Sequence, residues 1–161
     1  MIAQYDETGH INVTYNDPVP VELIAAIEAA GLFYLNIPPV PGEPVQRLDD
    51  DGNPIFENDG VTPVMREGDL VYPTISILDH YVKDEEIAAR PVFDIPEVIQ
   101  LAAGETVSFD LPAGTILIDA DDQRYPIEDG HVEFEGDATG THRYRLENFP
   151  YKPAKIEVIV A

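Results

Sequence analysis

Residues 140–147, Gly-Thr-His-Arg-Tyr-Arg-Leu-Glu, alternate between two kinds of side chain. His142, Tyr144 and Leu146 fall on one side of an extended chain, and Arg143 and Arg145 fall on the other, because successive side chains of a strand point to opposite faces. The stretch therefore predicts a strand with one buried face and one solvated face. Three more runs alternate in the same way, over residues 106–111, 131–135 and 156–160.

Turn-forming residues separate these runs at 112–114, 119–122, 129–130 and 136–140. Short strands at such regular spacing, each with one wet face, are typical of a two-sheet fold that needs no helix. The sequence predicts an Ig-like antiparallel β-sandwich of about seven strands over residues 96–161, within a mostly β protein.

Residues 1–95 predict a small α+β portion suited to docking. A β-hairpin is expected over residues 2–15, with its turn at 6–9, and a strand over 32–37. Between them Val21 to Ala30 is the one convincing helical run, with Asp17 as a plausible cap and Gly31 as the stop. A further strand over 74–82 is expected to turn back into 87–91.

The segment 38–73 is rich in Pro and Asp. Proline cannot sit inside a helix or a central strand, so the segment is expected to form an extended arm or long loop rather than a compact core. A turn at 49–54 is expected to close a hairpin between 45–48 and 55–57.

The chain carries 31 acidic residues against 9 basic ones, a net charge of −22. Nucleic-acid binding needs Lys and Arg to replace counterions on phosphates, so this balance argues against it, and it also disfavours anionic membranes. The charge fits either a salty environment or a plain need for solubility. The sequence shows no signal-peptide pattern and no apolar run of membrane-spanning length, so synthesis and retention in a cytoplasm until assembly are expected.

Two acidic turns are weak calcium candidates, one with Asp49, Asp51 and Asn53, the other with Asp119 and Asp121. Oxygen-bearing side chains at alternate positions resemble a calcium loop, but an EF-hand needs Gly at its sixth place and Glu at its twelfth. The first turn has Pro54 and Gly60 there. Solvated acidic turns are therefore favoured, and no metal or other cofactor is expected.

No catalytic residues are predicted. The chain has no Cys, its two serines lie in predicted strands outside any Gly-x-Ser-x-Gly turn, and it lacks a phosphate-binding glycine loop. His131 and Glu133 share a strand face, but no third ligand for zinc lies nearby in sequence. The protein is expected not to be an enzyme.

Basic residues gather near the C-terminus, where Tyr125, Arg143, Arg145 and Tyr151 form the predicted partner-binding set. The competing interpretation is internal salt bridging of the two arginines to Glu133 and Glu135 on a neighbouring strand. Internal pairing is the favoured alternative.

The C-terminal half also resembles a known family. Its motifs are Leu-Pro-Ala-Gly-Thr at 111–115, Tyr-Pro-Ile-Glu-Asp-Gly at 125–130, and Gly-Thr-His-Arg-Tyr-Arg-Leu-Glu-Asn-Phe-Pro-Tyr at 140–151. Upstream lie Asp-His-Tyr-Val at 79–82 and Ala-Arg-Pro at 89–91. Together these are similar to small proteins encoded among the tail and fibre genes of tailed bacteriophages. The chain departs from that pattern at His142, where an aromatic residue is expected, and at Lys152, where an acidic or apolar residue is usual.

This resemblance covers residues 78–161 and implies location rather than catalysis. It implies a structural component of a tailed-phage virion, in the tail, a tail fibre or the head surface, made in the host cytoplasm. Its partners would be other virion proteins, with a homo-oligomer in the particle. The alternative is an Ig-like adhesin that recognises carbohydrate or a cell surface, with calcium assisting and with Tyr125, Tyr144 and Tyr151 as contact residues.

Overall fold

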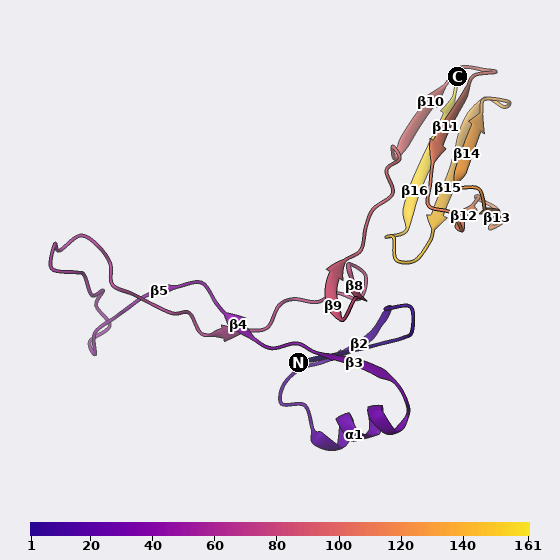
Figure 1. Ribbon diagram of the computed structural model, residues 1–161. Coiled ribbons are helices and arrows are strands. Elements are labelled where there is room, and N and C mark those ends of the chain that lie inside the picture. The colour runs from indigo at the N-terminus through magenta and orange to yellow at the C-terminus, as the bar shows by residue number, and fades with distance from the viewer. The chain divides into compact units, whose positions relative to one another are not determined.

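The computed structural model describes all residues from Met1 to Ala161 (Figure 1). The chain is mostly β with a single helix, which confirms the predicted fold class. It divides into two compact units, one formed by Met1–Ile77 with Val82–Glu86 and the other by Leu78–Tyr81 with Ile87–Ala161. The division therefore runs through residues 78–87 rather than at the predicted 95/96 boundary.

The first unit begins with a three-stranded sheet in the order β2-β1-β3. The strands β1 (Ile2–Tyr5) and β2 (Ile11–Tyr15) form the predicted hairpin, and β3 (Phe33–Asn36) pairs antiparallel with β1. Ile2, Ala3 and Ile11 are buried. The hairpin and the strand after the helix are thus confirmed.

Helix α1 (Val21–Ala29) connects β2 to β3 and turns Ile27 into the core of this unit. The predicted cap at Asp17 is wrong: the helix begins after Pro20, with no side-chain cap. Asp17 instead accepts hydrogen bonds from the Met1 amino group, at 2.9 Å, and from the Tyr72 hydroxyl. The Pro20 carbonyl instead accepts the backbone N–H groups of Leu23 at 3.1 Å and Ile24 at 3.3 Å, so the first turn closes without a side-chain cap. Gly31, at φ 66°, ends it as predicted.

Residues 38–73 form an antiparallel ribbon, referred to below as the arm. At its base β4 (Val40–Pro41) pairs with β7 (Leu70–Val71), and further along β5 (Val45–Gln46) pairs with β6 (Met65–Arg66). Two small loops complete the ribbon, one closed by the bridge Leu48↔Pro54 and one by Phe56↔Pro63. The predicted turn at 49–54 is therefore present, but β5 takes β6 rather than residues 55–57 as its strand partner.

The predicted strand over 74–82 is shorter than expected. Only β8 (His80–Lys83) is a strand, followed by β9 (Glu86–Ala89). Apolar alternation over 74–78 misled the prediction because no neighbouring strand pairs with these residues. Val82 donates its N–H to the Gly9 carbonyl at 2.8 Å. A Cβ at Gly9 would lie 2.0 Å from the Val82 carbonyl oxygen, so this approach requires glycine.

The second unit contains seven strands in two sheets. The larger sheet has the order β10-β16-β15-β12-β13, and the smaller one pairs β11 with β14. Their bounds are β10 (Val98–Leu101), β11 (Thr106–Asp110), β12 (Thr115–Ile118), β13 (Arg124–Ile127), β14 (His131–Glu135), β15 (Gly140–Glu147) and β16 (Ala154–Val160). The predicted seven strands and their turns are present.

One core joins the two sheets of this unit. Leu146, Ile156 and Val158 of the larger sheet pack in one cluster with Val132 and Phe134 of the smaller. The predicted alternation is confirmed, because these positions are buried and their strand neighbours are not. The expectation of a wholly antiparallel sandwich is wrong at one place, since β10 runs parallel to β16. Alternation shows which face a residue takes but not which way the neighbouring strand runs.

The same aspartate-capped turn occurs three times, beginning at Asp6, Asp49 and Asp119. Each carboxylate Oδ1 accepts the backbone N–H groups two and four residues later, at distances between 2.8 and 3.1 Å. The fourth residue of each turn has positive φ, namely Gly9 (88°), Gly52 (84°) and Asp122 (60°). Hydrogen bonds lower the pKa of all three aspartates from its usual value, chiefly the bond from the Thr8 hydroxyl at Asp6 and the bonds from the Asn53 and Gln123 backbone N–H groups at Asp49 and Asp119. Aspartates in this chain thus have a structural role in hairpin turns.

The turn that begins at Asp119 is the one copy in which the fourth residue, Asp122, has a Cβ and still takes the left-handed conformation. Replacing it with glycine, Asp122→Gly, should raise the free energy of unfolding by roughly 0.5–1 kcal/mol, because glycine adopts positive φ without steric cost. Chemical denaturation measures the change.

Asp121→Gly, at the preceding position, is the control and should not stabilise. Gly52→Ala in the matching turn should destabilise by about 1 kcal/mol from backbone strain, since no atom lies within 4 Å of the added methyl. Equal stability of Asp122→Gly and the parent chain would contradict the explanation.

Candidate interaction surfaces

The arm leaves its apolar side chains in solvent. No residue of 38–73 is buried. The arm holds nine of the seventeen large hydrophobic side chains that the whole chain exposes, although it is under a quarter of its length. They are Val40, Val45, Leu48, Phe56, Val61, Met65, Leu70, Val71 and Tyr72. Exposed apolar side chains in such number are typical of interaction surfaces.

Several backbone polar groups of the arm are hydrogen-bonded even though the arm buries no side chains. Three segments close on one another, with Arg47 N–H donating to Val64 O (2.8 Å), Ile55 N–H to Arg47 O (2.9 Å) and Val64 N–H to Ile55 O (3.0 Å). In the outer loop the Asp59 carboxylate accepts from the Thr62 N–H (2.8 Å) and hydroxyl (2.5 Å) and from the Val61 N–H (2.9 Å). The arm thus has a defined backbone fold without a core.

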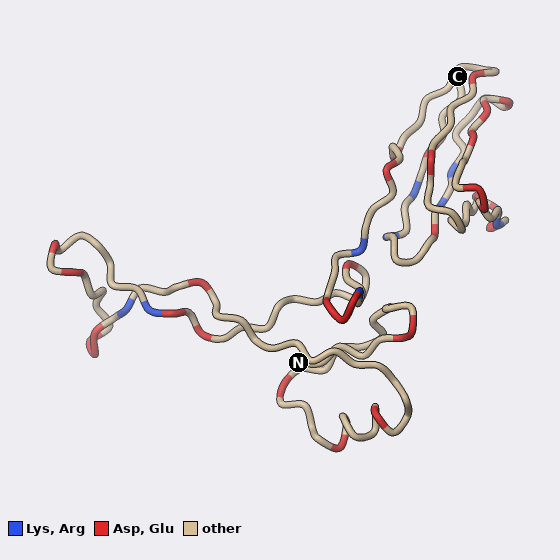
Figure 2. Tube along the Cα trace, in the orientation of Figure 1, with Lys and Arg blue, Asp and Glu red and all other residues tan.

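The arm is acidic. It contains eight Asp and Glu residues and two basic residues, Arg47 and Arg66, which gives a net charge of −6. The acidic positions recur along both legs of the ribbon and in its loops (Figure 2). A surface that mixes exposed apolar side chains with negative charge favours an apolar partner surface with basic residues at its rim.

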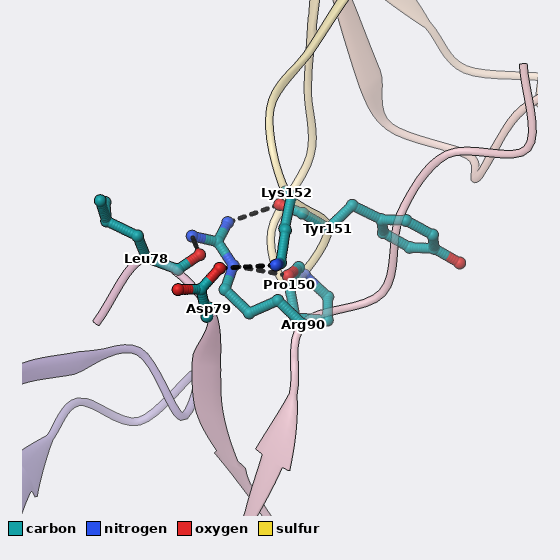
Figure 3. A network of polar contacts seen from close by, with 6 residues as sticks. All are labelled: Leu78, Asp79, Arg90, Pro150, Tyr151 and Lys152. Atoms are coloured by element: carbon teal, nitrogen blue, oxygen red, sulfur yellow. Dashed lines mark hydrogen bonds and ion pairs between the residues drawn. The ribbon is translucent and has the colours of Figure 1, made fainter. Parts of the chain in front are cut away.

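A second arrangement joins the start of the second unit to the corner after β15 (Figure 3). The Arg90 guanidinium donates to the carbonyl oxygens of Pro150 at 2.8 Å, Tyr151 at 2.5 Å and Leu78 at 3.4 Å. Its cationic group also lies 5.4 Å from the centre of the Phe149 ring. One planar side chain therefore holds two chain segments that are about sixty residues apart in sequence.

Neighbouring residues reinforce this junction. The Lys152 ammonium forms an ion pair with Asp79 at 2.5 Å, and the Tyr81 ring meets Phe149 edge-on at 5.9 Å. The Lys152 N–H donates to the Pro91 carbonyl at 2.9 Å. The sequence motifs at 79–82 and 89–91 thus contact the end of the motif at 140–151. The charge of Lys152, where the sequence resemblance leads one to expect an acidic or apolar residue, is matched here by Asp79.

The four predicted partner-binding residues do not form one patch. Tyr125 is 49 % exposed and donates its hydroxyl to Asp119 at 3.0 Å, which raises the pKa of this tyrosine. Arg143 lines the same groove as Tyr125. Tyr151 instead stacks on Phe93 at 5.0 Å and is partly buried against the core. The structure therefore brings together Tyr125 and Arg143 but not Tyr151.

Both arginines of the set form ion pairs, but with other carboxylates than expected. Arg143 pairs with Glu157 at 2.8 Å, and Arg145 pairs with Glu147 at 2.9 Å. The predicted partners Glu133 and Glu135 are wrong, because their strand β14 pairs with β11 in the other sheet. The order of strands in space could not be predicted from the alternation of residues along the chain.

The two calcium candidates are both aspartate-capped turns. The Asp49 carboxylate receives the Asp51 and Asn53 N–H groups, and the Asp119 carboxylate receives the Asp121 N–H and the Tyr125 hydroxyl. No group of three or more acidic, His or Cys side chains in the chain is arranged to hold a metal ion. Calcium binding at either turn, the less favoured alternative from the sequence, would have to compete with these hydrogen bonds.

No protein-family model, curated protein or solved structure matches the chain. None of its helices has the length and hydropathy needed to cross a membrane. The function is therefore argued from the surfaces themselves.

Arg90→Ala should lower the free energy of unfolding of the second unit by about 2 kcal/mol, because hydrogen bonds from a charged group are among the stronger ones. Arg90→Lys should recover little of this loss, since an ammonium cannot span both carbonyls as a planar guanidinium does. Denaturant unfolding of the full chain measures both.

Arg143→Ala is the matched control, because its ion pair with Glu157 is exposed on the sheet surface. Its effect should stay within about 0.5 kcal/mol. Losses of equal size at Arg90 and Arg143 would show that the junction is no stronger than a surface pair.

The Asp59 turn should weaken in acid. Its hydrogen bonds from Thr62 and Val61 lower the pKa of Asp59, so their contribution is present above the pKa of the unfolded chain and is lost as pH falls through the folded pKa. Carboxyl NMR titration should place the pKa of Asp59 below the ordinary value for an aspartate. Thr62→Val, which removes the hydroxyl donor, should raise the Asp59 pKa, and an unchanged value would contradict the assignment.

Proposed function

We propose that this protein is a structural component of a larger assembly, acts through protein–protein contacts and has no catalytic role. The single observation that carries the proposal is the arm, which holds a paired backbone, nine exposed large hydrophobic side chains and no buried residue. Completion of this surface by another protein is the function that the geometry supports best.

The energetic argument concerns the cost of ordering the arm. Fixing the backbone of one residue costs on the order of 1–2 kcal/mol, and a net backbone hydrogen bond returns about 1 kcal/mol. A two-stranded ribbon without a covered face is therefore marginal in water. Burial of Leu70, Phe56 and their exposed neighbours against a partner would supply the missing stabilisation.

For the second unit we propose an Ig-like sandwich. In such folds the second and fifth strands pair in one sheet, while the third, sixth and seventh lie in the other. The pairing of β11 with β14 and the order β16-β15-β12 have this arrangement. The unit lacks the cysteine pair of antibody domains, so the proposal rests on strand order and core.

The particular assembly proposed is the virion of a tailed bacteriophage. The resemblance of residues 78–161 to proteins encoded among phage tail and fibre genes supports it. The residues that carry this resemblance, at 79–82, 89–91 and 149–151, contact one another in the structure. The protein would be made in the host cytoplasm. In the particle it would form a homo-oligomer and contact other virion proteins. The charge of −22 would keep unassembled copies apart.

Shortening the arm tests the proposal. Replacing residues 42–69 with a short Asn-Gly turn should leave the unfolding of the second unit unchanged and remove the protein from purified particles. Light scattering at low and high salt should show a discrete oligomer for the full chain, promoted by salt because screening reduces self-repulsion, and a monomer for the shortened chain.

Point variants distinguish an effect specific to the arm from the effect of changing any exposed apolar side chain. Val61 in the arm and Val21 at the start of α1 are 77 % and 70 % exposed. Val61→Asp should reduce assembly, whereas Val21→Asp should not. Full assembly of the shortened chain, or a full-length monomer absent from particles, would overturn the proposal.

A second candidate is an Ig-like carbohydrate- or cell-surface-binding module. It is favoured by one observation: Tyr125 and Tyr144 line a groove of about 450 Å³ together with Asp119 and Arg143. Exposed aromatic rings beside carboxylates suit sugar rings and their hydroxyls. A glycan screen with and without calcium tests it, and a signal lost in Tyr125→Ala would support it over assembly alone.

A further inference from the structure

The second unit has an open side between its two sheets. Five strands form one sheet and two form the other, so the smaller sheet covers only part of the larger. Two adjoining hollows of about 450 and 280 Å³ lie on this side and share Leu117, His142 and Tyr144. Glu133, Phe134 and Glu135 of β14 form one wall.

The edge of β14 that faces away from β11 is unpaired. The N–H of Leu111 donates to Gly130 O, and the N–H of Gly136 donates to Glu105 O. Because hydrogen-bonded pairs alternate along an antiparallel ladder, Val132 and Phe134 use their backbone groups toward β11. Glu133 and Glu135 therefore direct their N–H and C=O groups outward.

The other edge strand beside this groove is blocked. Strand β13 contains Pro126, which has no N–H to donate. Strand β14 contains no proline. Its outer edge therefore keeps the donors and acceptors that an added strand needs.

Charge indicates what such a strand would carry. The solvent face of the β11–β14 sheet presents Asp110, Glu133 and Glu135 and contains no Lys or Arg. The Nδ1 atom of His131, on the same face, lies 3.2 Å from the Asp110 carboxylate. On an added strand, residues beside Glu133 and Glu135 would be favoured if basic, and the alternate residues would point toward Leu117 and Tyr144.

We propose that the outer edge of β14 accepts an extended peptide segment from a different protein, with apolar residues alternating with Lys or Arg. A second copy of this chain fits less well, because its free ribbon, the arm, carries a net charge of −6. The site uses none of the arm residues, so it and the arm's proposed function can fail separately.

The probe is a short blocked peptide in which valine alternates with lysine, tested on the full chain by calorimetry. The same peptide with glutamate in place of lysine is the control. The lysine peptide should bind, and more weakly as salt rises. Hydrogen exchange should slow at the Glu133 and Glu135 amides on binding. The His131 amide, which donates to Asp129 at 3.0 Å, should change little.

Two variants sharpen the test. Glu133→Pro removes an outward N–H and leaves the β11 ladder intact, so it should weaken binding by about tenfold or more. Glu133→Lys serves if the proline variant does not fold, and it should abolish the preference for the lysine peptide. Glu97→Lys, an equal change of charge away from the groove, should leave the preference nearly intact.

Several results would overturn the proposal. They are an absence of peptide binding, equal binding of both peptides, or exchange that slows elsewhere than at β14. Self-association of the chain that slows the same amides would assign the edge to a second copy. Binding of oligosaccharide in this groove, lost in Tyr125→Ala, would assign it to a glycan. Peptide binding at the β14 edge should be unchanged in the arm variants, even where those variants no longer assemble into particles.

Discussion

The feature of the molecule on which the rest depends is the arm, whose backbone is paired by hydrogen bonds while none of its side chains is buried. Its backbone forms a ladder through Arg47, Ile55 and Val64, yet every side chain keeps contact with water. Elsewhere the two go together, as in β15 and β16, which pair along seven positions and bury Leu146 and Ile156 almost completely. A paired ribbon left uncovered beside well-packed units is the observation on which we propose that another molecule completes the arm.

The negative charge has two separable roles in this picture. Part of it is used locally, since Asp6, Asp49 and Asp119 cap turns of one design with their carboxylates. The remainder lies on surfaces, where it opposes contact between copies and favours basic partners. The few basic residues are largely matched: Arg90 holds backbone carbonyls, while Arg143, Arg145 and Lys152 pair with carboxylates.

The sequence predicted what depends on local pattern and missed what depends on partners in space. Alternation located the strands around Val132, Leu146 and Ile156, and proline content identified the arm. The direction of β10, the ion-pair partners of Arg143 and the packing of Tyr151 against the core depend on which strands become neighbours. Alternation carries no such information. Arg90 was visible only as part of a motif. Its role depends on a carbonyl pair at the 149–151 corner, and no pattern within either segment encodes that contact.

Hydrogen exchange of the isolated full-length protein distinguishes an arm that is stable alone from one that needs a partner. The arm amides of Arg47, Ile55 and Val64 are hydrogen-bonded, but without burial they should exchange close to the rate of an unfolded chain. The β15 and β16 amides should exchange many orders of magnitude more slowly. Rapid exchange confined to the arm would confirm that its stability has to come from a partner. Arm amides as protected as those of β15 and β16 in the isolated protein would show that the arm is stable alone, and the account of an incomplete surface would be wrong.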